Sequence, residues 1–82
     1  MLNRILVIDD DIELCELLSD YLGSEGFEVR TVNQGEQGAA QALAEEYALV
    51  ILDVMLPGMN GFDVLRKIRE TSKLPVIMLT AR

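Results

Sequence analysis

Aspartates follow apolar runs at two places in this 82-residue sequence. Asp9-Asp10-Asp11 comes directly after Ile5 to Ile8, and Asp53 comes directly after Leu49 to Leu52. Clustered carboxylates repel one another and recruit a hard divalent cation, for which Mg²⁺ is the natural occupant. Because Mg²⁺ uses only one or two protein carboxylates, a further aspartate is left to react as a nucleophile and accept a phosphoryl group.

A hydroxyl could assist the same chemistry. Thr80 follows the apolar run Pro75 to Leu79, and its side chain could donate a hydrogen bond to a phosphoryl oxygen. Threonine is also ordinary at the end of a strand, so this residue alone is a weak signal.

Purely structural interpretations compete with this site. The run Asp9-Asp10-Asp11 could be a solvated turn with a helix cap, in which Asp10 and Glu13 form a capping box and Asp11 is a cap or surface residue. Asp53 is harder to explain in this way, because the apolar residues Val54-Met55-Leu56 continue after it. Charged groups are seldom buried without a partner, which favours a functional role for Asp53.

The elements that must position these residues alternate along the chain. Short apolar runs rich in β-branched residues are typical of strands covered on both faces, whereas apolar residues three and four apart indicate amphipathic helices. The alternating pattern of Phe27 to Val32 predicts a more exposed strand at an edge of the sheet. Strands are expected at Arg4–Ile8, Phe27–Val32, Ala48–Leu52 and Pro75–Leu79, and helices at Ile12–Leu22, from Gly35 or Glu36 to Glu46, and at Phe62–Arg69.

This alternation predicts an α/β fold with one parallel sheet and helices on both faces. Parallel strands need crossover connections, which are right-handed in nearly all proteins. Ligands of open α/β sheets bind outside the carboxyl ends of the strands. The polar residues that end the first, third and fourth strands should therefore meet at one edge.

Composition narrows the class of protein. A chain of this length forms one small domain, and a net charge of -7 with seven scattered Lys and Arg residues argues against a nucleic-acid surface. The single Cys15 cannot form an internal disulfide, which fits a reducing compartment. The apolar run after Met1 meets aspartates too soon for a signal peptide or a membrane span. We therefore expect a cytoplasmic protein without membrane or nucleic-acid contacts of its own.

Three stretches of the sequence together form a specific pattern. They are Ile5-Leu6-Val7-Ile8-Asp9-Asp10-Asp11, Leu52-Asp53-Val54-Met55-Leu56-Pro57-Gly58-Met59-Asn60-Gly61 and Pro75-Val76-Ile77-Met78-Leu79-Thr80-Ala81-Arg82. With them the chain resembles the receiver domains of bacterial two-component response regulators, which are CheY-like domains with a doubly wound, flavodoxin-like sheet. The resemblance covers the whole chain, which is most similar to the OmpR/PhoB class and in particular to its CpxR type.

The resemblance implies a role for each candidate residue. Asp53 would be the phosphoacceptor, and Asp9 and Asp10 would form the acidic pair that binds Mg²⁺. The backbone carbonyl of Met55 would complete the metal shell, and Thr80 would be the switch hydroxyl. The phosphoryl donor in the family is a phosphohistidine on a sensor histidine kinase, so this chain itself needs no histidine.

The same resemblance implies that residues 1–82 form a single partial receiver domain. Family members continue with a fourth helix, a fifth strand that carries a lysine, and a fifth helix. Without them the strand Val76 to Leu79 would expose an apolar edge, so we expect self-association or exchange of elements between copies. A DNA-binding domain, which follows the receiver domain in transcriptional regulators of this class, would belong to a longer parent protein.

Two other functions remain open at this point. Hydrolases and transferases that form an aspartyl phosphate usually carry a second aspartate two residues after the nucleophile, and Met55 stands there instead. The pattern therefore predicts no turnover enzyme. The second alternative is a non-catalytic, self-associating fragment of the receiver fold.

Overall fold

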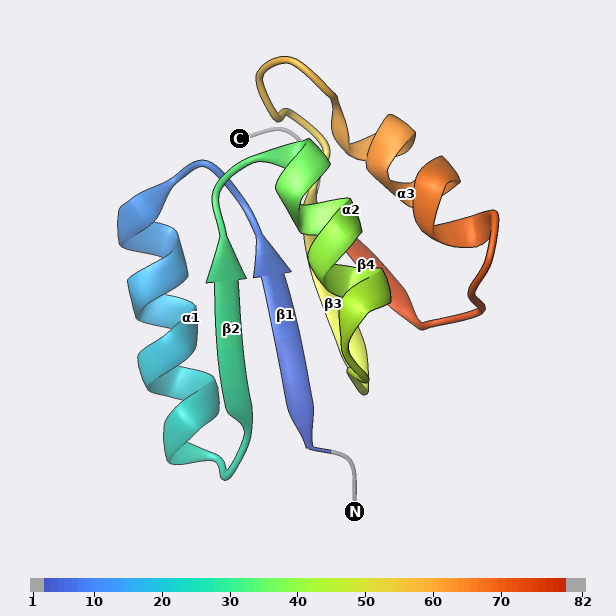
Figure 1. Ribbon diagram of the computed structural model, residues 1–82. Coiled ribbons are helices and arrows are strands. Elements are labelled where there is room, and N and C mark those ends of the chain that lie inside the picture. The colour runs from blue at the N-terminus through green and yellow to red at the C-terminus, as the bar shows by residue number, and fades with distance from the viewer. Residues whose placement is uncertain (1–2, 80–82) are drawn as a thin grey trace.

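Four parallel strands form one sheet, and three helices connect them (Figure 1). The computed structural model describes residues 3–79. Elements alternate between strand and helix along the chain, as the sequence predicted. They are β1 (Arg4–Ile8), α1 (Ile12–Ser24), β2 (Glu28–Val32), α2 (Gly35–Ala44), β3 (Leu49–Asp53), α3 (Gly61–Arg69) and β4 (Val76–Leu79).

The strand order is β2-β1-β3-β4, so the chain builds outward in one direction from β1 to β2 and in the other from β3 to β4. The two central strands are in register, with Ile5 beside Leu49 and Ile8 beside Leu52. This order confirms the doubly wound sheet and places β2 at an edge, where its exposed alternating pattern belongs. The strand order reverses between β1 and β3, which is where ligands bind in such sheets.

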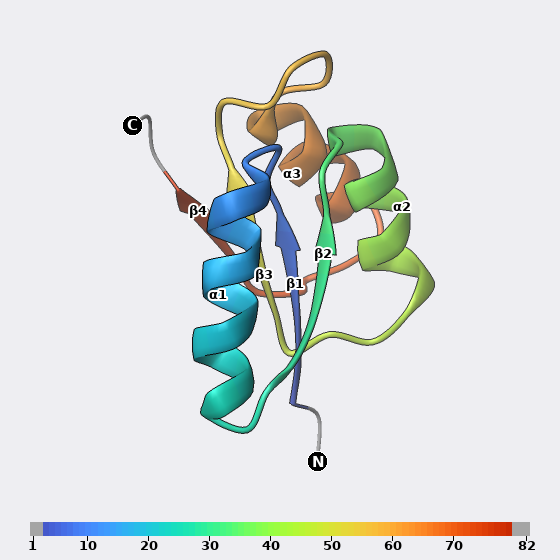
Figure 2. The same ribbon diagram turned by 90° about the vertical axis from the view of Figure 1, so that its left-hand side faces the viewer.

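Helices cover the two faces of the sheet unequally. Figure 2 shows α1 on one side and both α2 and α3 on the other. Ile5 and Val7 of β1 pack with Cys15 of α1, whereas Leu6 and Ile8 belong to the larger core under α2 and α3. Because β1 is covered on both faces, its apolar residues are continuous rather than alternating.

Gly38 allows α2 to lie close to the sheet. A Cβ atom at this position would lie 2.6 Å from Cγ2 of Ile8, which is well inside van der Waals contact. Ile8 is fully buried at the end of β1, directly before the acidic run. Close packing of α2 therefore holds the strand end on which the first aspartates follow.

Some predicted boundaries were wrong by one or two residues. Asp53 is the last residue of β3 rather than the first residue after it, because it pairs with Leu79 of β4. The helix α2 ends at Ala44, since Glu45 has an extended backbone. No helix in the described part of the chain is long and apolar enough to cross a membrane.

Candidate functional site

Three aspartates meet at the carboxyl ends of β1 and β3. One carboxylate oxygen from each of Asp9, Asp10 and Asp53 lies within 4.8 Å of the others. Asp9 and Asp53 are fully buried, whereas Asp10 is exposed. The structure thus brings together the three acidic residues that the sequence predicted, and one of them faces solvent.

The two buried carboxylates are held by matching local turns. The backbone N–H of Asp11 donates to Oδ1 of Asp9 at 2.9 Å, and the N–H of Met55 donates to Oδ1 of Asp53 at 3.0 Å. In both places the acceptor is the aspartate two residues earlier, an arrangement that short acidic side chains adopt readily at turns. Each turn fixes the orientation of its carboxylate at the end of a rigid strand.

Asp11 serves the helix. Its side chain accepts a hydrogen bond of 3.1 Å from the N–H of Leu14, and its extended backbone makes it the N-cap of α1. The predicted role of Asp11 as a cap is confirmed, and the capping box that would have made Asp10 the cap is wrong. Because Asp11 is the N-cap of α1, the side chain of Asp10 is left to take part in the acidic cluster.

Gly61 supports the backbone of Asp53. A Cβ atom on Gly61 would collide with the carbonyl oxygen of Asp53 and with Cα of Val54. The glycine instead lets its own N–H donate to the carbonyl oxygen of Val54 at 3.0 Å, which joins the start of α3 to the end of β3. The sequence pattern alone did not indicate this packing role for Gly61. Its position directly after Asn60, the N-cap of α3, was the available signal.

Asn33 is a second residue that sequence reasoning missed. Its side-chain Nδ2 donates to the backbone carbonyl oxygen of Asp9 at 2.9 Å. The N–H of Asp9 donates to the carbonyl oxygen of Val32 at 3.0 Å, so the last residue of β2 and the first residue after it hold Asp9 through two hydrogen bonds. Nothing in the sequence around Asn33 indicates this contact, because it depends on the pairing of β1 with β2.

The other predicted site residues are placed less completely. Thr80, the predicted switch hydroxyl, lies outside the described residues. The Met55 side chain is exposed and its N–H contacts Asp53, while the role of its carbonyl oxygen as a metal ligand stays a prediction. Cys15 lies beneath the site, where its Sγ donates to the carbonyl oxygen of Asp9 at 3.4 Å. Burial of Cys15, and then the negative charge of Asp9, raise the pKa of the thiol.

The donor set suits a hard divalent cation. All three side chains offer carboxylate oxygens, which are the ligands that Mg²⁺ prefers, and the exposed Asp10 leaves one side of the cluster open to solvent. Mg²⁺ usually keeps several waters or phosphate oxygens in its coordination shell, and an open side permits this. The residues present therefore fit the metal that the sequence predicted.

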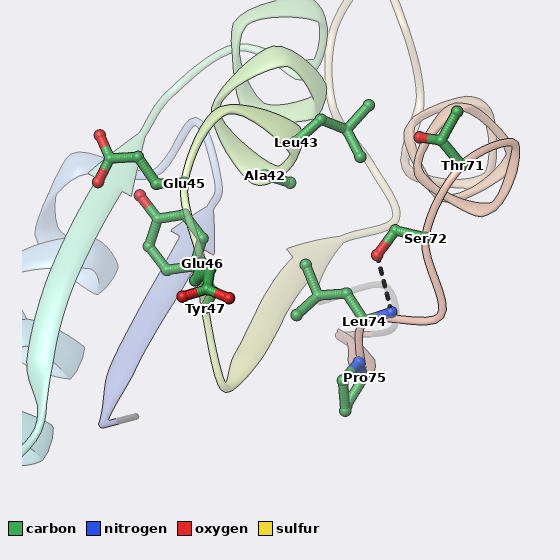
Figure 3. A pocket seen from close by; sticks show the side chains of 9 residues that line it. All are labelled: Ala42, Leu43, Glu45, Glu46, Tyr47, Thr71, Ser72, Leu74 and Pro75. Carbon is green, nitrogen blue, oxygen red and sulfur yellow. Dashed lines mark hydrogen bonds between the residues drawn. The ribbon is translucent and has the colours of Figure 1, made fainter. Parts of the chain in front are cut away.

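A separate hollow of about 540 Å³ lies at the other end of the sheet (Figure 3). It opens between the carboxyl end of α2 and the segment that leads into β4, where the Ser72 hydroxyl accepts from the N–H of Leu74 at 3.0 Å. Because Pro75 and Tyr47 precede β4 and β3, this hollow lies at the amino ends of the strands. It is not part of the acidic site.

Comparisons with known proteins agree with this geometry. The response regulator receiver domain family matches residues 5–82. The transcriptional regulatory protein CpxR homolog of Haemophilus influenzae is 54% identical over 81 residues, which cover 99% of this chain and 35% of that protein. The chain therefore spans about a third of the length of the curated relatives it matches.

Solved structures share the fold. The response regulator TrrA of Thermotoga maritima, crystallised in complex with Mg²⁺-BeF, has a TM-score of 0.90 and 40% identity, over 99% of this chain and 71% of that one. A structure of the same regulator in complex with the histidine kinase ThkA has a TM-score of 0.88 and 41% identity, over 98% of this chain and 70% of that one.

These findings settle the class of protein. The likeness to CpxR-type regulators confirms the predicted class, and the family is one of two-component receiver domains rather than turnover enzymes. The acidic cluster of Asp9, Asp10 and Asp53 stands at the site that the sequence assigned to it. A parallel sheet in the order 2-1-3-4, an acidic cluster where that order reverses, and a family match over residues 5–82 together show that this chain belongs to the response regulator receiver domains.

Proposed function

We propose that this chain accepts a phosphoryl group on Asp53 within a two-component phosphorelay. In this proposal Asp9, Asp10 and Asp53 hold Mg²⁺ through carboxylate oxygens, and the Met55 carbonyl oxygen completes the protein ligands. The observation that carries the proposal is the burial of Asp53 beside two further carboxylates, all within 4.8 Å. Two buried carboxylates beside a third oppose folding by mutual repulsion, so their presence favours a functional reason.

The chemistry is a transfer between two nucleophiles. A carboxylate oxygen of Asp53 attacks the phosphorus of a phosphohistidine, a new O–P bond forms, and the N–P bond breaks. The electron pair of the broken bond stays on the imidazole nitrogen. Bound Mg²⁺ supplies positive charge that offsets the charge developing on the phosphoryl oxygens. The hydrogen bond from the Met55 N–H keeps the carboxylate of Asp53 in one orientation during the attack.

Thr80 would act after the transfer. By the family resemblance its hydroxyl donates a hydrogen bond to a phosphoryl oxygen and thereby reports the phosphorylated state. The hydrogen bond from the N–H of Val54 to the carbonyl oxygen of Leu79, at 3.1 Å, supports this role, because it ties the end of β4 to the end of β3.

A sensor histidine kinase is the donor that we propose. The kinase complex of the related regulator TrrA supports this choice. The names of the CpxR relatives support a longer parent protein that regulates transcription. By the family resemblance, a separate domain of that parent would bind DNA. A two-component relay and a single unpaired Cys15 together support a cytoplasmic location.

The first experiment uses Mg²⁺ with beryllofluoride, which mimics a phosphoryl group on aspartate. We expect shifts of the amide NMR signals of Asp9, Asp10 and Asp53 that require both reagents and that are lost in Asp53→Asn. Asp20→Asn, on the exposed part of α1, is the matched control and should respond like the parent chain. A folded chain without a response would instead favour the alternative of a non-catalytic fragment of the receiver fold.

We also propose that the chain associates with a second copy through β4. Among the described strands β4 pairs only with β3, and Ile77 is 52% exposed beside that pairing. Apolar edge strands pair readily with other chains. Light scattering should give a mass above that of the monomer, and Ile77→Lys should lower it. A monomeric parent chain at micromolar concentration would contradict this proposal.

A further inference from the structure

The backbone of Asp9 is held by a contact that comes from the β2 side of β1, opposite to the side on which β3 lies. Asn33 lies in the loop between β2 and α2, and its Nδ2 donates to the carbonyl oxygen of Asp9 at 2.9 Å. The same nitrogen lies 3.6 Å from Sγ of Cys15, which itself donates to that carbonyl oxygen at 3.4 Å. Three elements, β1, α1 and the β2–α2 loop, therefore meet at one carbonyl group.

The hydrogen bonds to the Asp9 backbone oppose the electrostatic repulsion between the three carboxylates. The side chains of Asp9, Asp10 and Asp53 carry like charges within 4.8 Å, and their repulsion pushes the end of β1 away from the end of β3. The hydrogen bonds from Asn33 and to Val32 lie on the side of Asp9 away from Asp53. They fix the backbone from which the first two carboxylates project.

We infer that Asn33 is a positioning residue for the metal site: its side-chain amide holds the backbone of Asp9 and so keeps the carboxylates of Asp9 and Asp10 arranged for a divalent cation. This inference rests on the proposed function of the acidic site. In this assignment Asn33 acts through the backbone of Asp9, to whose carbonyl oxygen its Nδ2 donates, and not as a ligand of the cation.

The decisive variant is Asn33→Leu, which keeps the branched shape of asparagine and removes the N–H donor. The loss of one hydrogen bond to a backbone carbonyl should raise the dissociation constant for Mg²⁺ about fivefold. Asn33→Ala should raise the dissociation constant for Mg²⁺ by a similar factor, without adding the bulk of leucine. Gln34→Leu is the matched control, because Gln34 is the next residue, is exposed and makes no side-chain capping hydrogen bond.

Two readouts separate positioning from a merely structural role. Mg²⁺ alone is titrated into each 82-residue variant and followed by amide NMR signals, and the free energy of unfolding is measured with urea in the presence of a chelator. In the chelator, hydrogen exchange of the Asp11 amide, which donates to Oδ1 of Asp9, should be several-fold faster in Asn33→Leu than in Gln34→Leu.

Each outcome of the Mg²⁺ titration either supports or overturns the positioning role of Asn33. Weaker Mg²⁺ binding in both Asn33 variants, beyond any change in the free energy of unfolding and absent from Gln34→Leu, supports the positioning role. Equal Mg²⁺ binding in all variants overturns that role and leaves the metal site intact. A parent chain that is folded and binds no Mg²⁺ overturns the metal site and the role of Asn33 with it.

Discussion

Replacement of Asp53 by asparagine should stabilise the metal-free chain. Asp9 and Asp53 are both fully buried, and their carboxylate oxygens approach within 4.8 Å. Two like charges at that distance repel by about 3.5 kcal/mol when the effective dielectric constant is about 20. Asparagine removes one charge and keeps an oxygen that can accept the hydrogen bond from the Met55 N–H. We therefore expect the free energy of unfolding to rise by roughly 1 to 3.5 kcal/mol.

The assay is urea unfolding, followed by circular dichroism, first with a chelator and then with Mg²⁺. The parent chain should gain about 2.7 kcal/mol when the Mg²⁺ concentration is about a hundred times its dissociation constant, since only the folded state binds. Asp53→Asn lacks one of the proposed metal ligands and should gain clearly less. Asp20→Asn, which removes an exposed charge from α1, should behave as the parent chain does in both conditions.

One result would refute this reasoning. If Asp53→Asn is less stable than the parent chain in the chelator, then the carboxylate of Asp53 stabilises the fold and is not a strained functional group. The acidic cluster would then be part of the scaffold, and repulsion between its carboxylates would no longer favour a metal site.

Three further predictions concern the scaffold. Gly38→Ala should lower the free energy of unfolding measured with urea by about 1 to 3 kcal/mol, because the added Cβ would overlap Ile8 at the end of β1. Gly23→Ala has open space around the added Cβ and should raise the free energy of unfolding by about 0.5 to 1 kcal/mol. Glu45→Gln should lower the thermal midpoint near neutral pH, because the hydrogen bond from Arg4 holds the pKa of Glu45 below its ordinary value of 4.5. That stabilisation is complete above pH 4.5 and disappears as the pH falls through the lowered pKa, so the two midpoints should converge in acid. Asn60→Ala should cost about 1 kcal/mol in urea through loss of the N-cap of α3, and Asn60→Asp should cost little.

Much of the fold could be read from the sequence because burial leaves a local signature. The continuous apolar runs of β1 and β3 indicated strands covered on both faces, and the alternation in β2 indicated an edge. Boundaries were less predictable, since they depend on partners elsewhere in the chain. Asp53 belongs to β3 only because Leu79 of β4 pairs with it.

The candidate site also has one part that the sequence indicated and one part that only the tertiary structure showed. The sequence alone determined which aspartates end the strands, because an acid directly after a buried apolar run is visible without a structure. The family resemblance attached the roles of phosphoacceptor and metal ligand to them. Only the tertiary structure decided that Asn33 holds the backbone of Asp9 and that Gly61 must lack a side chain beside Asp53. These two facts rest on contacts between segments that are adjacent in space, and a one-dimensional pattern does not record which backbone will approach which side chain.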